Sequence, residues 1–195
     1  LGPTWLDFDG DDYPDVYIAN GTGGDNRLYR NNGDGSFTDV TSDTPLALTR
    51  FEGAQSLAAD IDNDGDEDLY VLGEHPVLAV AGIGERGLED NPVPGHRGHL
   101  FINHGDCWRD GTAESGLLED TWVPGPDGGP RRAIAGAFGD YDRDGCVDLY
   151  LVHWRMGGDI EPEWEQDRLY RNDCTGRFTD VTVEAGLDGY PRNGL

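Results

Sequence analysis

The sequence lacks lysine altogether: apart from five histidines, its basic side chains are 14 arginines. Against them stand 39 aspartates and glutamates, so the 195-residue chain has a formal net charge of −25. Nucleic-acid phosphates and anionic lipid headgroups would repel a chain of this charge. The composition therefore argues against a nucleic-acid partner and against binding to anionic membranes.

Several kinds of motif are also missing. No apolar stretch is long enough to cross a bilayer. The three cysteines form no C-x-x-C pair, which argues against a zinc ribbon or haem attachment. There is no nucleophile elbow, zinc-protease motif or phosphate-binding loop. We expect structural or incidental roles for the histidines, since none lies at metal-ligand spacing from another His or Cys. They are His75, His96, His99, His104 and His153. We therefore expect no catalytic residue and no enzyme.

Aspartate is abundant in three nine-residue loops, at residues 7–15, 60–68 and 140–148. Each loop has carboxylates at its positions 1, 3, 5 and 9. These are Asp7, Asp9, Asp11 and Asp15; Asp60, Asp62, Asp64 and Asp68; and Asp140, Asp142, Asp144 and Asp148. Like charges this close repel one another unless a cation lies among them. Calcium takes six to eight oxygen ligands, so the pattern predicts three Ca²⁺ sites.

The residues after each loop indicate a strand rather than a helix. An EF-hand needs a glutamate at position 12 and a helix on each side. Position 12 is instead Ile18, Val71 or Leu151, within runs rich in β-branched and aromatic residues. The aspartate at position 9 is therefore expected to be the first residue of a strand.

The loops belong to a longer repeat of strand, acidic loop, strand, connection, strand, hairpin and strand. The strand before each loop is rich in small residues, which allows neighbouring backbones to approach closely near the axis of a radial array. Four antiparallel strands of this kind make one propeller blade. The sequence thus predicts an all-β fold with three blades, at residues 1–46, 51–118 and 131–188. Propellers have about four to eight blades, so this partial propeller needs further blades or other subunits to close.

Two segments of the repeat resemble a known family. The first is the loop D-x-D-x-D-G-x-x-D; the second is L-Y-R-N-x-G-x-G-x-F-T-D-V-T at residues 28–41, repeated at 169–182 with Cys174 in place of a glycine. Both are similar to FG-GAP/VCBS repeats, the blades of integrin-α-type propellers. The form that continues to A-G-L is most similar to the acidic-repeat proteins that carry an ASPIC/UnbV domain. Asp12 stands where the family has glycine; aspartate tolerates left-handed backbone, so we expect the turn to survive.

We expect the backbone carbonyl at position 7 to complete each calcium site. Those residues are Tyr13, Asp66 and Cys146. Cys146 and Cys174 fall at the metal end of the third blade on adjacent strands, so we predict a disulfide between them. Such a bond implies an oxidising compartment, and with the resemblance it indicates an extracellular, cell-surface or periplasmic protein.

Long insertions at residues 73–98 and 154–166 fall between the second and third strands of blades two and three, at the end opposite the acidic loops. Long loops on a rigid scaffold are frequent binding sites, and Trp154, Arg155 and Trp164 are residue types that anchor interfaces. The expected function is protein or glycan recognition or adhesion, with structural calcium. Two alternatives stay open: a subunit of a surface layer or filament, and a propeller-type lyase or hydrolase with its site in the central channel.

Overall fold

The computed structural model describes residues 2–20, 25–44, 46, 53–73, 98–105, 107–117, 132–154 and 167–187. Regular structure in these residues is β, apart from the single 3-10 turn η1 (Thr41–Asp43). The strands form three four-stranded antiparallel sheets, each in the order of the sequence. The predicted all-β fold is therefore confirmed, and the sheets are consistent with propeller blades.

The first sheet contains β1 (Gly2–Leu6), β2 (Asp15–Ala19), β3 (Arg27–Asn31) and β4 (Phe37–Asp39). The second contains β5 (Gly53–Ala59), β6 (Asp68–Gly73), β7 (Gly98–Asn103) and β8 (Trp108–Asp110). The third contains β9 (Arg132–Gly139), β10 (Asp148–Trp154), β11 (Arg168–Asn172) and β12 (Phe178–Asp180). In each sheet the acidic loop joins the first two strands and a hairpin joins the last two, so both lie at the same end.

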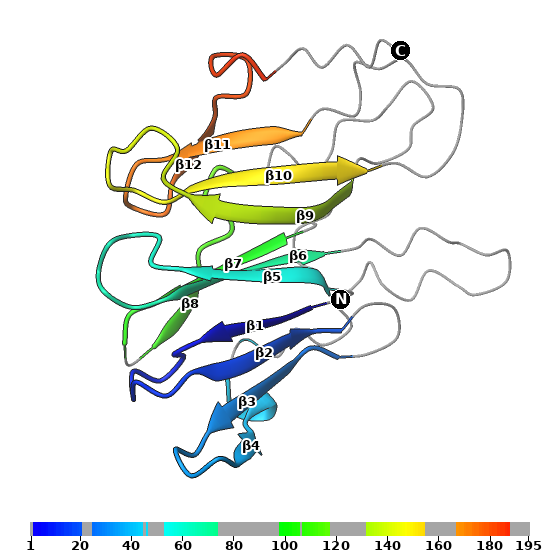
Figure 1. Cartoon of the computed structure of the whole chain (residues 1–195), viewed down its shortest axis with the longest axis vertical. Coiled ribbons are helices and arrows are strands. Elements are labelled where there is room, and N and C mark those ends of the chain that lie inside the picture. The colour runs from blue at the N-terminus through cyan, green and yellow to red at the C-terminus, as the bar shows by residue number, and fades with distance from the viewer. Residues whose placement is uncertain are drawn as a thin grey trace, which may run out of the picture.

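The three sheets are stacked, and β5 lies between β1 and β9 (Figure 1). The Thr4 hydroxyl donates a 2.7 Å hydrogen bond to the backbone carbonyl of Ser56. The backbone N–H of Gly136 donates to Oε1 of Gln55 at 3.0 Å. A Cβ on Gly136 would lie 3.1 Å from a methyl carbon of Leu57. The small residues thus let the first strands of neighbouring sheets approach closely.

Two apolar cores hold the stack together, and β6 contributes to both. Leu69 and Val71 belong to the cluster between the first and second sheets. Tyr70 and Leu72 belong to the cluster between the second and third sheets. Because β6 is covered on both faces, its sequence is a continuous apolar run rather than an alternation.

The predicted blade boundaries stay predictions. The segments where one blade would pass to the next, 47–52 and 118–131, lie outside the described residues, as do residues 74–97 and 155–166 of the two insertions.

Candidate metal centres in the acidic loops

The aspartate at position 9 anchors each acidic loop to its sheet. Asp15, Asp68 and Asp148 are the first residues of β2, β6 and β10, as expected, and all three are buried. The carboxylate of Asp68 accepts two hydrogen bonds of 2.8 Å, from the backbone N–H groups of Ile61 and Asn103. Asp15 and Asp148 accept the equivalent pairs in their own sheets. Each buried carboxylate is thus fixed by its own loop and by β3, β7 or β11.

The carboxylates at positions 1, 3 and 9 converge in all three loops. The clusters are Asp7, Asp9 and Asp15; Asp60, Asp62 and Asp68; and Asp140, Asp142 and Asp148. In each cluster every residue offers an oxygen, and these oxygens lie within 4.8 Å of one another. Carboxylate oxygens arranged in this way could hold a metal ion.

The carboxylate at position 5 lies outside these clusters. Asp11, Asp64 and Asp144 each accept a hydrogen bond of 2.9–3.0 Å from the backbone N–H at position 7 of the same loop. The residue at position 6 has left-handed backbone in every loop, including Asp12 with a φ of 66°. The turn therefore survives the replacement of glycine by Asp12, as the sequence predicted.

The buried carboxyl groups at position 9 resist ionisation in the absence of a cation. Burial raises the pKa of Asp68 to about 7; its two backbone donors oppose the rise, and the charges of Asp62 and Asp64 add to it. Burial also raises the pKa of Asp15 and of Asp148. A bound cation would lower these pKa values again, because it favours the charged form of the carboxylates.

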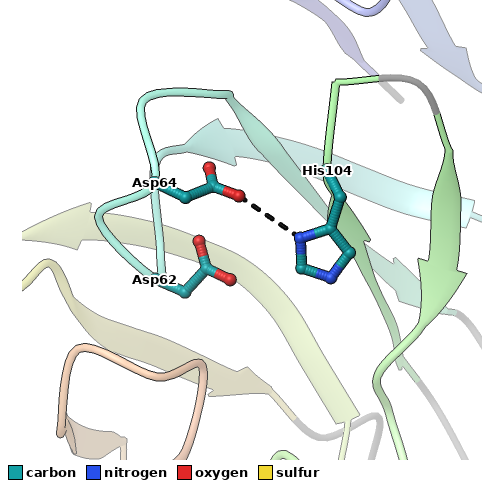
Figure 2. Close-up of side chains that lie close together, drawn as sticks. All are labelled: Asp62, Asp64 and His104. Carbon is teal, nitrogen blue, oxygen red and sulfur yellow. Dashed lines mark hydrogen bonds and ion pairs between the residues drawn. The ribbon is translucent and has the colours of Figure 1, made fainter.

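A fourth cluster involves a residue that sequence reasoning did not select. Figure 2 shows His104, from the β7–β8 hairpin, facing Asp62 and Asp64 of the acidic loop. Nδ1 of His104 lies 3.3 Å from Oδ2 of Asp64. The ligand atoms of these three residues also lie within 4.8 Å of one another, so they too could hold a metal ion. Comparison of the three repeats could have identified it. The residue after Asn103 is His104, whereas the corresponding residues of the other two hairpins are Asn32 and Asp173.

The predicted disulfide is confirmed. Cys146 and Cys174 are bonded, with their Cα atoms 5.0 Å apart. Cys107 is a free, exposed cysteine. A disulfide of this kind is typical of proteins that fold in an oxidising compartment.

Other predicted site residues stay predictions. They are the position-7 carbonyls of Tyr13, Asp66 and Cys146, the position-5 carboxylates as calcium ligands, and the partner-binding roles of Trp154, Arg155 and Trp164. Arg155 and Trp164 lie outside the described residues, and of Trp154 only the backbone, at the end of β10, is described.

In the part of the chain that the structure describes, no helix has the length and apolar character needed to span a bilayer.

Three stacked four-stranded sheets with an acidic cluster at the same corner of each define a repeat protein of the propeller-blade class. Residues 7–71 match the model of the FG-GAP-like repeat. That segment includes the first two acidic loops, β2, and the first four residues of β6. The finer resemblance, to proteins that carry an ASPIC/UnbV domain, stays a prediction. No curated protein matches the chain.

Among solved structures, the chain is similar to a lectin of Agrocybe aegerita that recognises non-reducing terminal N-acetylglucosamine. The sequence identity is 18% and the TM-score is 0.46. The match covers 91% of this chain and 36% of the lectin chain, so this chain spans about a third of that protein's length.

Proposed function

We propose that the chain is a calcium-stabilised segment of a β-propeller that serves protein or glycan recognition outside the cytoplasm. The observation that carries this is the same carboxylate cluster at the same corner of three consecutive sheets. Calcium prefers carboxylate oxygens over nitrogen and sulfur ligands and tolerates irregular geometry. The carboxylates are thereby assigned to ion binding rather than to acid–base catalysis.

Calcium would stabilise the turn between the first two strands of each sheet. In the second sheet, Asp60, Asp62 and Asp68 would supply ligands, Asp64 would join them if its side chain turned inward, and the carbonyl of Asp66 would complete the set. Because an ion that binds only the folded state stabilises it by mass action, each site adds about 2.7 kcal/mol when free calcium is 100 times Kd.

A thermal melt of the purified chain in excess Ca²⁺ and in chelator tests the calcium role. We expect the melting temperature to rise with Ca²⁺ and calorimetry to count three sites. Each of the matched variants Asp15→Asn, Asp68→Asn and Asp148→Asn should remove one of the three calcium sites. Mg²⁺ should give a smaller shift, since it demands octahedral geometry and keeps several waters. Equal melting temperatures in Ca²⁺ and chelator would remove the structural role of calcium.

A further sheet of the same kind would cover the outer face of the third sheet. Ile61 is fully buried where the third sheet covers the second, whereas Tyr141, at the same loop position, is 46% exposed. Tyr141 lines a hollow of about 560 Å³ together with Phe138, Tyr150 and Leu187. Another blade, from this polypeptide or from another subunit, would fill it.

Recognition would use the end opposite the ion clusters, where the connections β6–β7 and β10–β11 leave the sheets. Screening the calcium-loaded chain against immobilised glycans and candidate cell-surface proteins tests this. Replacement of Arg155 or Trp164 by alanine should weaken the interaction found, while Asp43→Asn, an exposed change in η1, should leave it unchanged. Binding that survives both alanine replacements would place recognition elsewhere.

A further inference from the structure

We propose that the second sheet carries an additional metal site, made by Asp62, Asp64 and His104, that takes a divalent transition-metal ion of the zinc class. It is distinct from the cluster of Asp60, Asp62 and Asp68, with which it shares one carboxylate. It does not require that calcium fill that cluster, and it uses Asp64 as the structure places it, beside His104 rather than turned toward that cluster. It thus goes beyond the structural calcium proposed above.

The imidazole of His104 distinguishes this site from a purely acidic loop. His104 comes from a different element, the β7–β8 hairpin, 40 residues beyond Asp64. Imidazole nitrogen is a preferred ligand for zinc, copper and nickel, whereas calcium is bound by oxygen. A cluster of one imidazole and two carboxylates therefore favours a transition-metal ion over calcium.

The geometry agrees with a shared ion. Zinc lies about 2.0–2.2 Å from nitrogen and oxygen ligands, so two ligands of a tetrahedral zinc ion are about 3.4 Å apart. Nδ1 of His104 and Oδ2 of Asp64 are 3.3 Å apart, a hydrogen-bond contact whose length also fits two ligands of one ion. Three protein ligands leave a fourth position for water or an added ligand. With 41% of the His104 side chain and 33% of the Asp64 side chain exposed, an ion could enter from solvent.

Asp62 provides a second observation. The Asp62 side chain is partly exposed, and the backbone N–H of Asp64 acts on its carboxyl group, but its Oδ1 atom is buried and has no hydrogen-bond partner among the described residues. A buried carboxylate oxygen without a donor is costly unless a cation neutralises it. Asp62 belongs to both clusters of this loop, and a carboxylate that bridges two ions about 3.5–4 Å apart is a known arrangement in two-metal sites.

The other two sheets provide an internal comparison. Their hairpins carry Asn32 and Asp173 where the second sheet has His104, and no described cluster there includes a histidine. Only the second loop is therefore expected to take the additional ion.

The test is a Co²⁺ titration followed by visible absorption, with Zn²⁺ calorimetry beside it, on the whole chain in a large excess of Ca²⁺. We expect one equivalent of Co²⁺ to bind with the strong d–d bands of a low-coordinate site. His104→Asn, which introduces the residue of the first hairpin, should weaken binding roughly tenfold or more, because even the loss of a group that only orients a metal ligand costs 10–100-fold. The same variant should keep its calcium response, which shows that it is folded.

A second histidine of the same sheet provides the matched control. Nδ1 of His99 lies 3.6 Å from the carboxylate of Asp110. The corresponding pairs are Arg27 with Asp39 and Arg168 with Asp180. His99→Arg therefore restores the arrangement of the other sheets and should leave Co²⁺ and Zn²⁺ binding unchanged. The proposed site would be overturned if no additional equivalent of Co²⁺ bound, or if His104→Asn bound Co²⁺ as tightly as the parent. It would also be overturned if His104→Asn and His99→Arg weakened Co²⁺ binding equally. None of these results would bear on the structural role of calcium, which the thermal melts in Ca²⁺ and in chelator test separately.

Discussion

The side-chain amide of Asn172 donates a 2.7 Å hydrogen bond from Nδ2 to the carbonyl oxygen of Ile61, in the acidic loop of the preceding sheet. The same nitrogen donates to the carbonyl of Val147 at 3.1 Å, and the backbone N–H of Asn172 donates to Oδ1 of Asp148 at 3.0 Å. One buried residue thus connects the ion cluster of the third sheet to the loop of the second.

Removal of the Asn172 side chain should therefore cost more than the loss of a single hydrogen bond. Asn172→Ala leaves the carbonyls of Ile61 and Val147 without this donor, and each buried, unsatisfied group costs about 1–3 kcal/mol. We expect the free energy of unfolding to fall by about 2–4 kcal/mol in urea titrations.

The matched control is Asn31→Ala in the first sheet. Its Nδ2 donates to Pro14, an exposed bond within its own sheet, so the expected loss is about 1 kcal/mol or less. Equal losses in the two variants would show that the bond to Ile61 contributes nothing.

A pair of glycines isolates the contact between the second and third sheets. Gly116 and Gly186 follow β8 and β12 at the same place in the repeat, with φ values of 76° and 73°. A Cβ on Gly116 would collide with the carbonyl oxygen of Phe178, whereas a Cβ on Gly186 would meet nothing within 4 Å. Alanine in left-handed backbone costs about 1–2 kcal/mol at either position.

Gly116→Ala should therefore destabilise the protein more than Gly186→Ala, by an additional 1–3 kcal/mol or so, typical of overpacking. Thermal melts of the two variants under the same calcium concentration give the comparison. The carbonyl of Ser115 also accepts a 2.7 Å hydrogen bond from the N–H of Phe178, which limits how far the two sheets can separate. Equal stability of the Gly116→Ala and Gly186→Ala variants would mean that the second and third sheets can move apart at no cost in stability.

The pH dependence of the ion-free protein should reveal the buried carboxyl of Asp68. Its pKa is about 7 in the folded protein, against an ordinary 3.8. Between these values the folded protein keeps a proton that the unfolded chain has released. Stability from this group is therefore fully present below pH 4 and is lost as the pH rises to 7.

Comparison of the parent with Asp68→Asn in chelator isolates this effect from other titrating groups, such as His99. Because the variant cannot ionise at residue 68, its stability relative to the parent should rise from pH 4 to pH 7, by more than about 1 kcal/mol. Excess calcium should abolish or reverse the trend, since the ion favours the charged carboxylate. A relative stability that stays flat in chelator would contradict the raised pKa.

The parts of the structure that sequence predicted are those encoded locally. The aspartates at positions 1, 3 and 9 lie in one short loop, so their spacing was enough to place them around one point. The repeat also placed Cys146, just before β10, and Cys174, just after β11, at the same end of the third sheet, because both could be compared with two other copies of the same unit.

His104 was missed for the opposite reason. It is far from Asp64 in sequence, and it contacts the loop only because the β7–β8 hairpin lies at the same end of the sheet. The position-5 carboxylates Asp11, Asp64 and Asp144 lie outside the three clusters that spacing predicted, and each accepts a backbone N–H of its own loop. Their role as calcium ligands therefore stays a prediction.

Loss of the disulfide between Cys146 and Cys174 should destabilise the third sheet. The bond closes a loop with a sequence separation of 28 residues. Restricting the unfolded chain by a loop of this length stabilises the folded protein by about 3–4 kcal/mol.

Cys174 has left-handed backbone, with a φ of 63°, where the other hairpins have Gly33 and Gly105. Cys146→Ala with Cys174→Gly should therefore lose about 1 kcal/mol less than Cys146→Ala with Cys174→Ala. Urea unfolding of both double variants measures this difference, with Cys107→Ser, an exposed free thiol, as the control that should match the parent. Equal stability of the oxidised parent and the alanine pair would show that the bond does not stabilise the fold.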